Sequence, residues 1–151
     1  MAESIGVIDL ARAIKAPPNE VFRAWTEPAL LTQWLATRAE ADPRVGGRYR
    51  LESDGGADMP GVHVCSGEYL EVAPDERIAK TWVYEGPNPD DTGETMVTVR
   101  LFPIDDGRST EMQFREEGQG LGTDEDREFS LQAWTTAFDE LDRILSTASQ
   151  A

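Results

Sequence analysis

The stretch "AWTEPALLTQWL", residues 24–35, decides the fold of this chain. Pro28 disfavours a helical conformation at the residue before it and suits the first turn of a new helix. Apolar residues recur at helical spacing on both sides of this proline. The stretch therefore predicts two short helices that meet at residues 26–28, and each helix turns one tryptophan, Trp25 or Trp34, toward the same side.

The residues before this stretch predict a strand that ends abruptly. Residues 5–16 alternate in the way a strand with two different faces does. Prolines at positions 17 and 18 then stop the strand. The first helix has two possible starts, one with Asn19 as its N-cap and one with Pro18 at its first helical position.

The residues after position 36 change to strand and turn patterns. Turn signals occur at residues 74–75 (Pro-Asp), at residues 106–107 (Asp-Gly) and over the glycine-rich residues 54–61. Residues 87–94 are polar and predict a loop. The patterns indicate about six strands in this part of the chain. Because consecutive strands are joined by short turns, we expect an antiparallel sheet.

The last part of the chain predicts one long helix. Thr123 and Asp126 form a start that resembles a capping box, and the acidic first turn favours the positive end of the helix dipole. Phe129 falls off the apolar stripe of this helix and is expected to face a loop. An antiparallel sheet has one apolar face to cover, so the helix is expected to lie across it while the two short helices close one end. The stripe consists of Leu131, Trp134, Phe138, Leu141 and Leu145.

Length and charge limit the possible functions. The 151 residues suit a single domain, 1–151. A net charge of −15 opposes binding to nucleic acid or to an anionic membrane surface. No apolar run approaches the ~20 residues that span a bilayer, and the N-terminus does not have the pattern of a signal peptide. We therefore expect a cytoplasmic protein that binds neither nucleic acid nor membrane.

Histidine and cysteine chemistry is limited by their numbers. His63 is the only histidine and Cys65 the only cysteine, which excludes an intrachain disulfide. On a strand the two side chains point the same way, but they are separated by roughly 6.6–7 Å along the strand. That separation is too large for the hydrogen bond of a Cys–His catalytic pair. A zinc site normally needs several such ligands. We therefore predict no metal and no cofactor, and we assign no catalytic residue.

Charged residues on the predicted strands are expected to be at the surface. The carboxylates Glu68, Glu71, Glu111 and Glu116 are expected to alternate outward. The best-placed cationic candidates near the sheet are Arg48, Arg50 and Arg100, which are expected to pair with such acids at the surface.

Several segments together resemble a known family. They are "RAIKAPPNEVFRAWTEPALLTQWLA" (12–36), "GGRYRLE" (46–52), "GEYLEVAPDERIAKTW" (67–82), and a tryptophan followed by "LDRIL" (141–145). They resemble the activator-of-heat-shock-ATPase-homologue (AHSA-type) branch of the SRPBCC, or START-like, superfamily. Two departures from its pattern are Lys80, where such proteins usually have an apolar residue, and the absence of histidine from residues 116–126.

The resemblance implies an α+β helix-grip fold, also called START-like or Bet v-like. In that fold a curved antiparallel sheet wraps around a long C-terminal helix, with two short helices after the first strand. It also implies an interior cavity between the sheet and that helix. Trp34 is then expected to pack the second short helix onto the sheet, and Trp25 is expected to lie near the cavity end.

We expect the cavity to bind a small hydrophobic or amphipathic ligand. For each aromatic residue taken alone, packing in a filled core is the favoured interpretation. For the aromatic residues together, the family resemblance favours a pocket that they line. The candidate ligand-binding residues are Trp25, Tyr49, Leu51, Trp82, Tyr84, Val97, Val99, Met112, Phe114, Trp134 and Phe138.

Two other functions stay open. A cyclase- or aromatase-like enzyme acting on a polyketide-type substrate would move protons with a tyrosine, a glutamate or His63, and an ionisable group with a perturbed pKa in the cavity would distinguish it. The family name also suggests a partner of a heat-shock ATPase. That reading ranks last, because the N-terminal region expected for the role is not found before this domain.

Overall fold

The described part of the chain forms one strand, two short helices, six further strands and a long helix. A computed structural model describes residues 6–55, 60–88, 90 and 92–149, except for the side chains of residues 147–149. The strands are β1 (Gly6–Ile14), β2 (Arg38–Ala41), β3 (Arg48–Asp54), β4 (Val62–Ala73), β5 (Arg77–Glu85), β6 (Thr92–Ile104) and β7 (Ser109–Gly118). The helices are α1 (Pro18–Thr26), α2 (Pro28–Trp34) and α3 (Asp124–Ser149), with the 3-10 turns η1 (Asp105–Gly107) and η2 (Gln119–Leu121).

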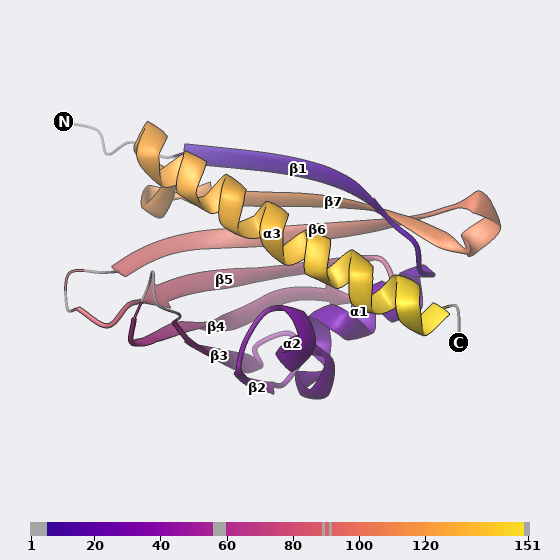
Figure 1. Cartoon of the computed structure of the whole chain (residues 1–151), viewed down its shortest axis with the longest axis horizontal. Helices are drawn as coiled ribbons and strands as arrows, with labels where there is room; N and C mark the ends of the chain where they lie inside the picture. The colour runs from indigo at the N-terminus through magenta and orange to yellow at the C-terminus, as the bar shows by residue number, and fades with distance from the viewer. Residues whose placement is uncertain (1–5, 56–59, 89, 91, 150–151) are drawn as a thin grey trace.

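The described strands form a single seven-stranded antiparallel sheet. Their order is β1-β7-β6-β5-β4-β3-β2, so the first strand of the chain pairs with the last. The sheet curves, and α3 lies across its concave face while α1 and α2 close one end (Figure 1). The predicted helix-grip fold is confirmed.

The bend between α1 and α2 follows from their prolines. Pro18 is at the first position of α1 with Pro17 as the N-cap, so the helix begins at Pro18 and Asn19 is not its cap. Glu27 is extended, with φ −92° and ψ 125°, and it separates the two helices directly before Pro28. Trp34 is buried and packs against Trp25 at a centroid distance of 4.9 Å. Its Nε1 also donates a hydrogen bond to the Ala24 carbonyl.

The turns lie where the sequence predicts them, with one correction. Asp75, between β4 and β5, has φ 65°, and Asp106 and Gly107, between β6 and β7, have φ 57° and 82°. These left-handed values explain why Asp and Gly occupy the turns. The predicted loop over residues 87–94 is too long, because β6 begins at Thr92 and pairs there with Glu85. Residues 56–59 of the predicted turn at 54–61, and residues 89 and 91, lie outside the described residues.

Helix α3 begins as predicted but buries a shorter stripe. The Thr123 hydroxyl accepts a hydrogen bond from the backbone N–H of Asp126 at 3.0 Å. Leu131, which the sequence predicts in the buried stripe, is 38% exposed. Leu131 lies seven residues before the buried Phe138, close to two full turns, and so on nearly the same side of the helix. Its exposure therefore comes from its position in the first half of α3, where Phe129 is also exposed. The buried stripe therefore consists of Trp134, Phe138, Leu141 and Leu145.

Candidate functional site

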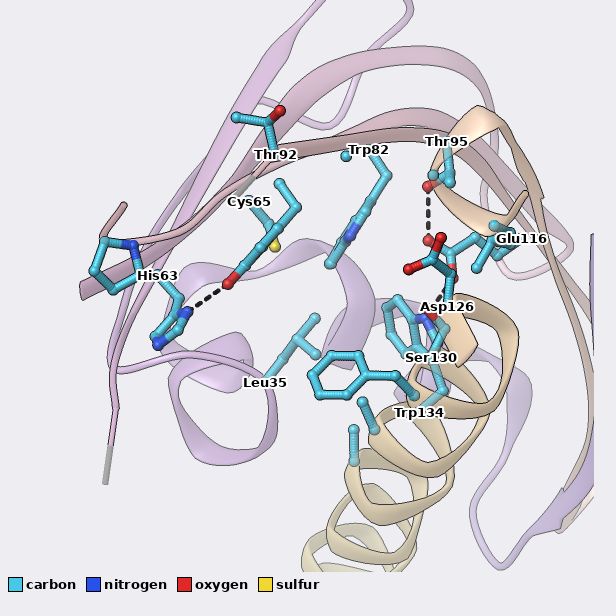
Figure 2. Close-up of a pocket in the computed structure, with 18 of the residues that line it drawn as sticks. Leu35, His63, Cys65, Trp82, Thr92, Thr95, Glu116, Asp126, Ser130 and Trp134 are labelled. Atoms are coloured by element: carbon cyan, nitrogen blue, oxygen red, sulfur yellow. Dashed lines mark hydrogen bonds between the residues drawn. The ribbon is translucent and has the colours of Figure 1, made fainter. Parts of the chain in front are cut away.

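A cleft of about 730 Å³ opens between the strands and the first half of α3. Its walls come from β4, β5 and β6, from the end of β7 with η2, and from the N-terminal turns of α3 (Figure 2). Its apolar and aromatic lining includes Leu35, Trp82, Tyr84, Leu121, Phe129, Ala133, Trp134 and Ala137. Its polar lining includes His63, Cys65, Asn88, Asp90, Thr92, Thr95, Glu116, Asp126 and Ser130.

Strand alternation brings these side chains to one face. His63 and Cys65 are two residues apart on β4 and both line the cleft, as their spacing predicts. Tyr84 on β5 is paired with Cys65 and turns the same way. The Nδ1 atom of His63 lies 2.6 Å from the Tyr84 hydroxyl, so the histidine is oriented by the tyrosine rather than by the cysteine.

Cys65 is not activated as a nucleophile. Burial raises the pKa of its thiol to about 12, so the thiol stays protonated at neutral pH. A reactive cysteine instead needs surroundings that favour the thiolate.

Glu116 is a buried carboxyl group in the wall of the cleft. It is 4% exposed and accepts hydrogen bonds from Thr95 Oγ1 at 2.6 Å and from Trp134 Nε1 at 3.0 Å (Figure 2). Burial raises the pKa of Glu116, and these two hydrogen bonds oppose the rise. Among the described residues no lysine or arginine forms an ion pair with it.

The expectation that Glu116 points outward is wrong. Thr110, Met112 and Phe114 are buried on the inner face of β7, and Glu116 continues the same two-residue period. The alternation alone would have placed it inward. Its polarity misled the prediction, because an ionisable residue on a strand is usually at the surface. Glu68 and Glu71 are exposed, as expected.

Lys80 lies beneath the cleft in a cage of aromatic rings. It is 1% exposed, and its Nζ is 4.4 Å from the Tyr49 ring centroid, 5.3 Å from that of Trp25 and 5.4 Å from that of Trp82. Burial lowers the pKa of Lys80 to about 7, and no described carboxylate forms an ion pair with it. The ring faces attract the ammonium form and so make its burial tolerable. Lys80 does not line the cleft.

Most of the predicted ligand-binding residues lie in a filled core instead of the cleft. Trp82, Tyr84 and Trp134 line the cleft. Trp25, expected near the cavity end, is fully buried in the core, with its ring 6.0 Å from Trp134 and its Nε1 against the Met112 sulfur. The other predicted residues, which are buried in the same core, are Tyr49, Leu51, Val97, Val99, Met112, Phe114 and Phe138.

Other candidate groups lie elsewhere on the molecule. Arg48 and Arg50 line a shallow exposed groove on the sheet, and Arg50 lies 3.5 Å from Glu52 as an exposed pair. Arg100 lines two other grooves, separate from the cleft. Within the described part of the chain, no group of three or more His, Cys, Asp or Glu is arranged to hold a metal ion.

Comparison with known families identifies the chain. Its sequence matches the family described as "Activator of Hsp90 ATPase homolog 1-like protein" over residues 15–146. The chain belongs to this family. The predicted AHSA-type, START-like assignment is therefore confirmed. A search of curated proteins gave no match.

Solved structures share the AHSA-type fold. Protein CV1439 from Chromobacterium violaceum is 31% identical with a TM-score of 0.76, and the match covers 92% of this chain and 96% of that one. Protein MLL2253 from Mesorhizobium loti is 27% identical with a TM-score of 0.74, covering 94% and 98%. DynU16, from the dynemicin biosynthetic locus, is 22% identical with a TM-score of 0.75, covering 94% of this chain and 48% of DynU16. At that identity the match shows the fold alone.

Among the described helices, none combines the length and apolar character needed to cross a membrane.

Proposed function

We propose that this AHSA-type protein binds a small hydrophobic or amphipathic ligand in the cleft beneath the first half of α3. The observation that supports the proposal is the cleft itself. Its volume of about 730 Å³ is within the range of roughly 300–1,000 Å³ typical of small-molecule sites. Aromatic and aliphatic walls with a few polar groups are the usual lining of such sites.

The division between core and cleft also supports this function. The second half of α3 seals the core with Phe138, Leu141 and Leu145, which are at most 5% exposed. The first half leaves Phe129 59% exposed at the cleft. Covering this ring with a ligand would remove apolar surface from water, which is the main favourable contribution to binding such a ligand.

The test uses a neutral fluorescent probe, N-phenyl-1-naphthylamine, with energy transfer from tryptophan as the signal. Trp82 and Trp134 line the cleft, so a bound probe lies close to both donors. Saturable binding is expected, and about 100 times Kd of the probe should add about 2.7 kcal/mol to stability. For a chain of this size that corresponds to a rise in Tm of about 5–11 °C.

A matched pair of variants on α3 locates the site. Ala133→Phe fills the cleft and is expected to weaken probe binding at least tenfold. Thr136→Phe adds the same ring at an exposed position that does not line the cleft, and it should leave binding unchanged. Absence of saturable binding, or equal binding by both variants, would count against the proposal.

A second candidate function is proton transfer by Glu116 on a substrate held in the cleft, as in the cyclase- or aromatase-like alternative. A buried carboxyl with a raised pKa in a pocket is the kind of group that serves as a general acid or base. Incubation with polyketide-type chains, followed by mass spectrometry, tests this function. Product formed by the natural protein and lost in Glu116→Gln supports it, and no product from the natural protein rejects it for these substrates.

A further inference from the structure

We propose that the ligand of this cleft is a cationic amphiphile whose ammonium group lies against Glu116 and the surrounding rings. This inference rests on the proposed binding function and names the chemical class of the ligand. It is carried by the charge of the lining, the environment of Glu116 and the aromatic faces beside it.

The ionisable lining of the cleft is almost entirely acidic. Glu116 lies in its wall, and Asp90 and Asp126 are exposed lining residues. Among the described lining residues there is no lysine or arginine, and His63 is the single basic side chain. The whole chain carries a net charge of −15. A cleft with one sign of charge concentrates ligands of the opposite sign and repels those of the same sign.

Glu116 has hydrogen-bond donors but, among the residues that the structure describes, no cationic side chain as a counter-ion. Its two oxygens are bound by neutral groups, the Thr95 hydroxyl and the Trp134 indole N–H. A buried carboxylate needs a positive partner, and without one it takes up a proton. This explains why burial raises the pKa of Glu116. A ligand ammonium in the cleft would supply the missing charge beside a carboxylate that is already oriented.

Aromatic rings lie beside this carboxyl group. Trp82 and Trp134 have centroids 5.0 Å apart, and Tyr84 and Phe129 also line the cleft. Aromatic faces attract cations, and rings together with a carboxylate are typical of sites for alkylammonium groups. Lys80 contacts Trp82 from within the core. Because its pKa is lowered to about 7, it is mostly uncharged at pH 8 and then competes little with a ligand cation.

The experiment compares three ligands that share one tail and differ in head group. They are octyltrimethylammonium, 1-octanol and octanoate, measured at pH 8 by displacement of N-phenyl-1-naphthylamine. Salt at about 0.15 M screens the general attraction of the acidic surface over distances beyond about 8 Å. The ammonium ligand is expected to bind at least about tenfold more tightly than octanol, and octanoate should bind most weakly.

Two glutamine variants separate Glu116 from the acidic surface. Glu116→Gln preserves shape and is expected to remove most of the preference for ammonium while octanol binding remains. Glu128→Gln changes an exposed carboxylate on α3 that does not line the cleft, and it should keep the preference. If Glu116→Gln does not fold, the octyltrimethylammonium titration is repeated on Ala133→Phe and Thr136→Phe. Loss of ammonium binding only in Ala133→Phe places the ammonium ligand in the cleft, and equal binding by both variants overturns the inference.

Each outcome has a distinct meaning. If none of the three ligands displaces the probe and the probe itself does not bind, the proposed binding function fails. If octanol or octanoate binds as tightly as the ammonium ligand, only the present inference fails. A preference for ammonium that persists unchanged in Glu116→Gln would also overturn it, because the acidic surface and not the cleft would be responsible.

Discussion

Replacing Lys80 with methionine is expected to stabilise this protein. Lys80 is 1% exposed, and its ammonium group is surrounded by rings without a described carboxylate partner. Methionine has a similar length, fills similar space and carries no charge. Replacing an uncompensated buried charge with an apolar side chain of similar volume is often stabilising.

The magnitude follows from the pKa of the buried amine. Burial lowers the pKa of Lys80 from 10.5 to about 7. Below pH 7 both the folded and the unfolded chain hold the proton, and the full penalty, on the order of 5 kcal/mol, opposes folding. Between pH 7 and 10.5 the unfolded chain binds more protons, so the stability of the natural protein rises with pH. The penalty at pH 7 is about 4 kcal/mol, and at pH 9 it is about 2 kcal/mol.

Urea unfolding followed by tryptophan fluorescence at pH 6, 7, 8 and 9 measures this difference. Lys80→Met should exceed the natural protein in unfolding free energy by about 4 kcal/mol at pH 7, and the advantage should shrink toward pH 9. The only other lysine, Lys15, is exposed, so Lys15→Met is a matched control with little expected effect. A less stable Lys80→Met variant, or an advantage equal at pH 6 and pH 9, would refute the reasoning.

Two further predictions concern Glu116 and the start of α3. Because burial raises the pKa of Glu116 above 4.5, the folded protein keeps this proton after the unfolded chain has lost it. The stability that this bound proton contributes is lost as pH rises through the pKa of Glu116 in the folded protein. Glu116→Gln does not titrate, so its Tm relative to that of the natural protein should increase between pH 4 and pH 8 in thermal unfolding. Thr123→Ala removes the hydroxyl that accepts the Asp126 N–H and should lower stability by about 1 kcal/mol. Thr123→Ser keeps a hydroxyl, so urea unfolding should give it nearly the same unfolding free energy as the natural protein. Equal losses of unfolding free energy in Thr123→Ser and Thr123→Ala would exclude the N-cap hydrogen bond as the cause.

The fold could be predicted because its signals are local. Pro28 sets the bend between α1 and α2 through its own ring, whatever the rest of the chain does. The alternation on β6 and β7 identifies the inner face directly, and Val97, Val99 and Met112 are all fully buried. The sequence does not predict the bounds of the short strand β2, because its four residues, Arg38–Ala41, are too few to show a period.

The cleft could not be predicted in the same way, because it depends on how much space the side chains leave unfilled. Trp25 and Phe114 carry the same apolar signal as Trp82, yet the first two fill the core and the third lines the cleft. The difference lies in which part of α3 each ring faces. Trp25 and Phe114 pack against Phe138, where α3 seals the sheet, and Trp82 lines the cleft that remains near Ser130. Sequence periodicity gives the face of a residue but not its depth along that face.

Trp134 stands at this boundary, and Trp134→Phe tests the coupling between core and cleft. Its ring packs against Phe114 at 4.5 Å, and its Nε1 donates to Glu116. Phenylalanine keeps part of the packing and removes the donor. Since this hydrogen bond opposes the rise in the pKa of Glu116, its loss should raise that pKa further.

Carbon-13 NMR titration of the Glu116 carboxyl group measures this change directly. The upward shift should be accompanied by a loss of stability of about 1–3 kcal/mol that is larger at pH 8 than at pH 4, because the ionised carboxylate loses a donor. Thr95→Val removes the other donor, whose hydroxyl also lowers the pKa of Glu116, and should shift it in the same direction. An unchanged pKa in Trp134→Phe would mean that the indole N–H does not orient the carboxyl group. The first half of α3 would then cover the cleft without controlling its charge.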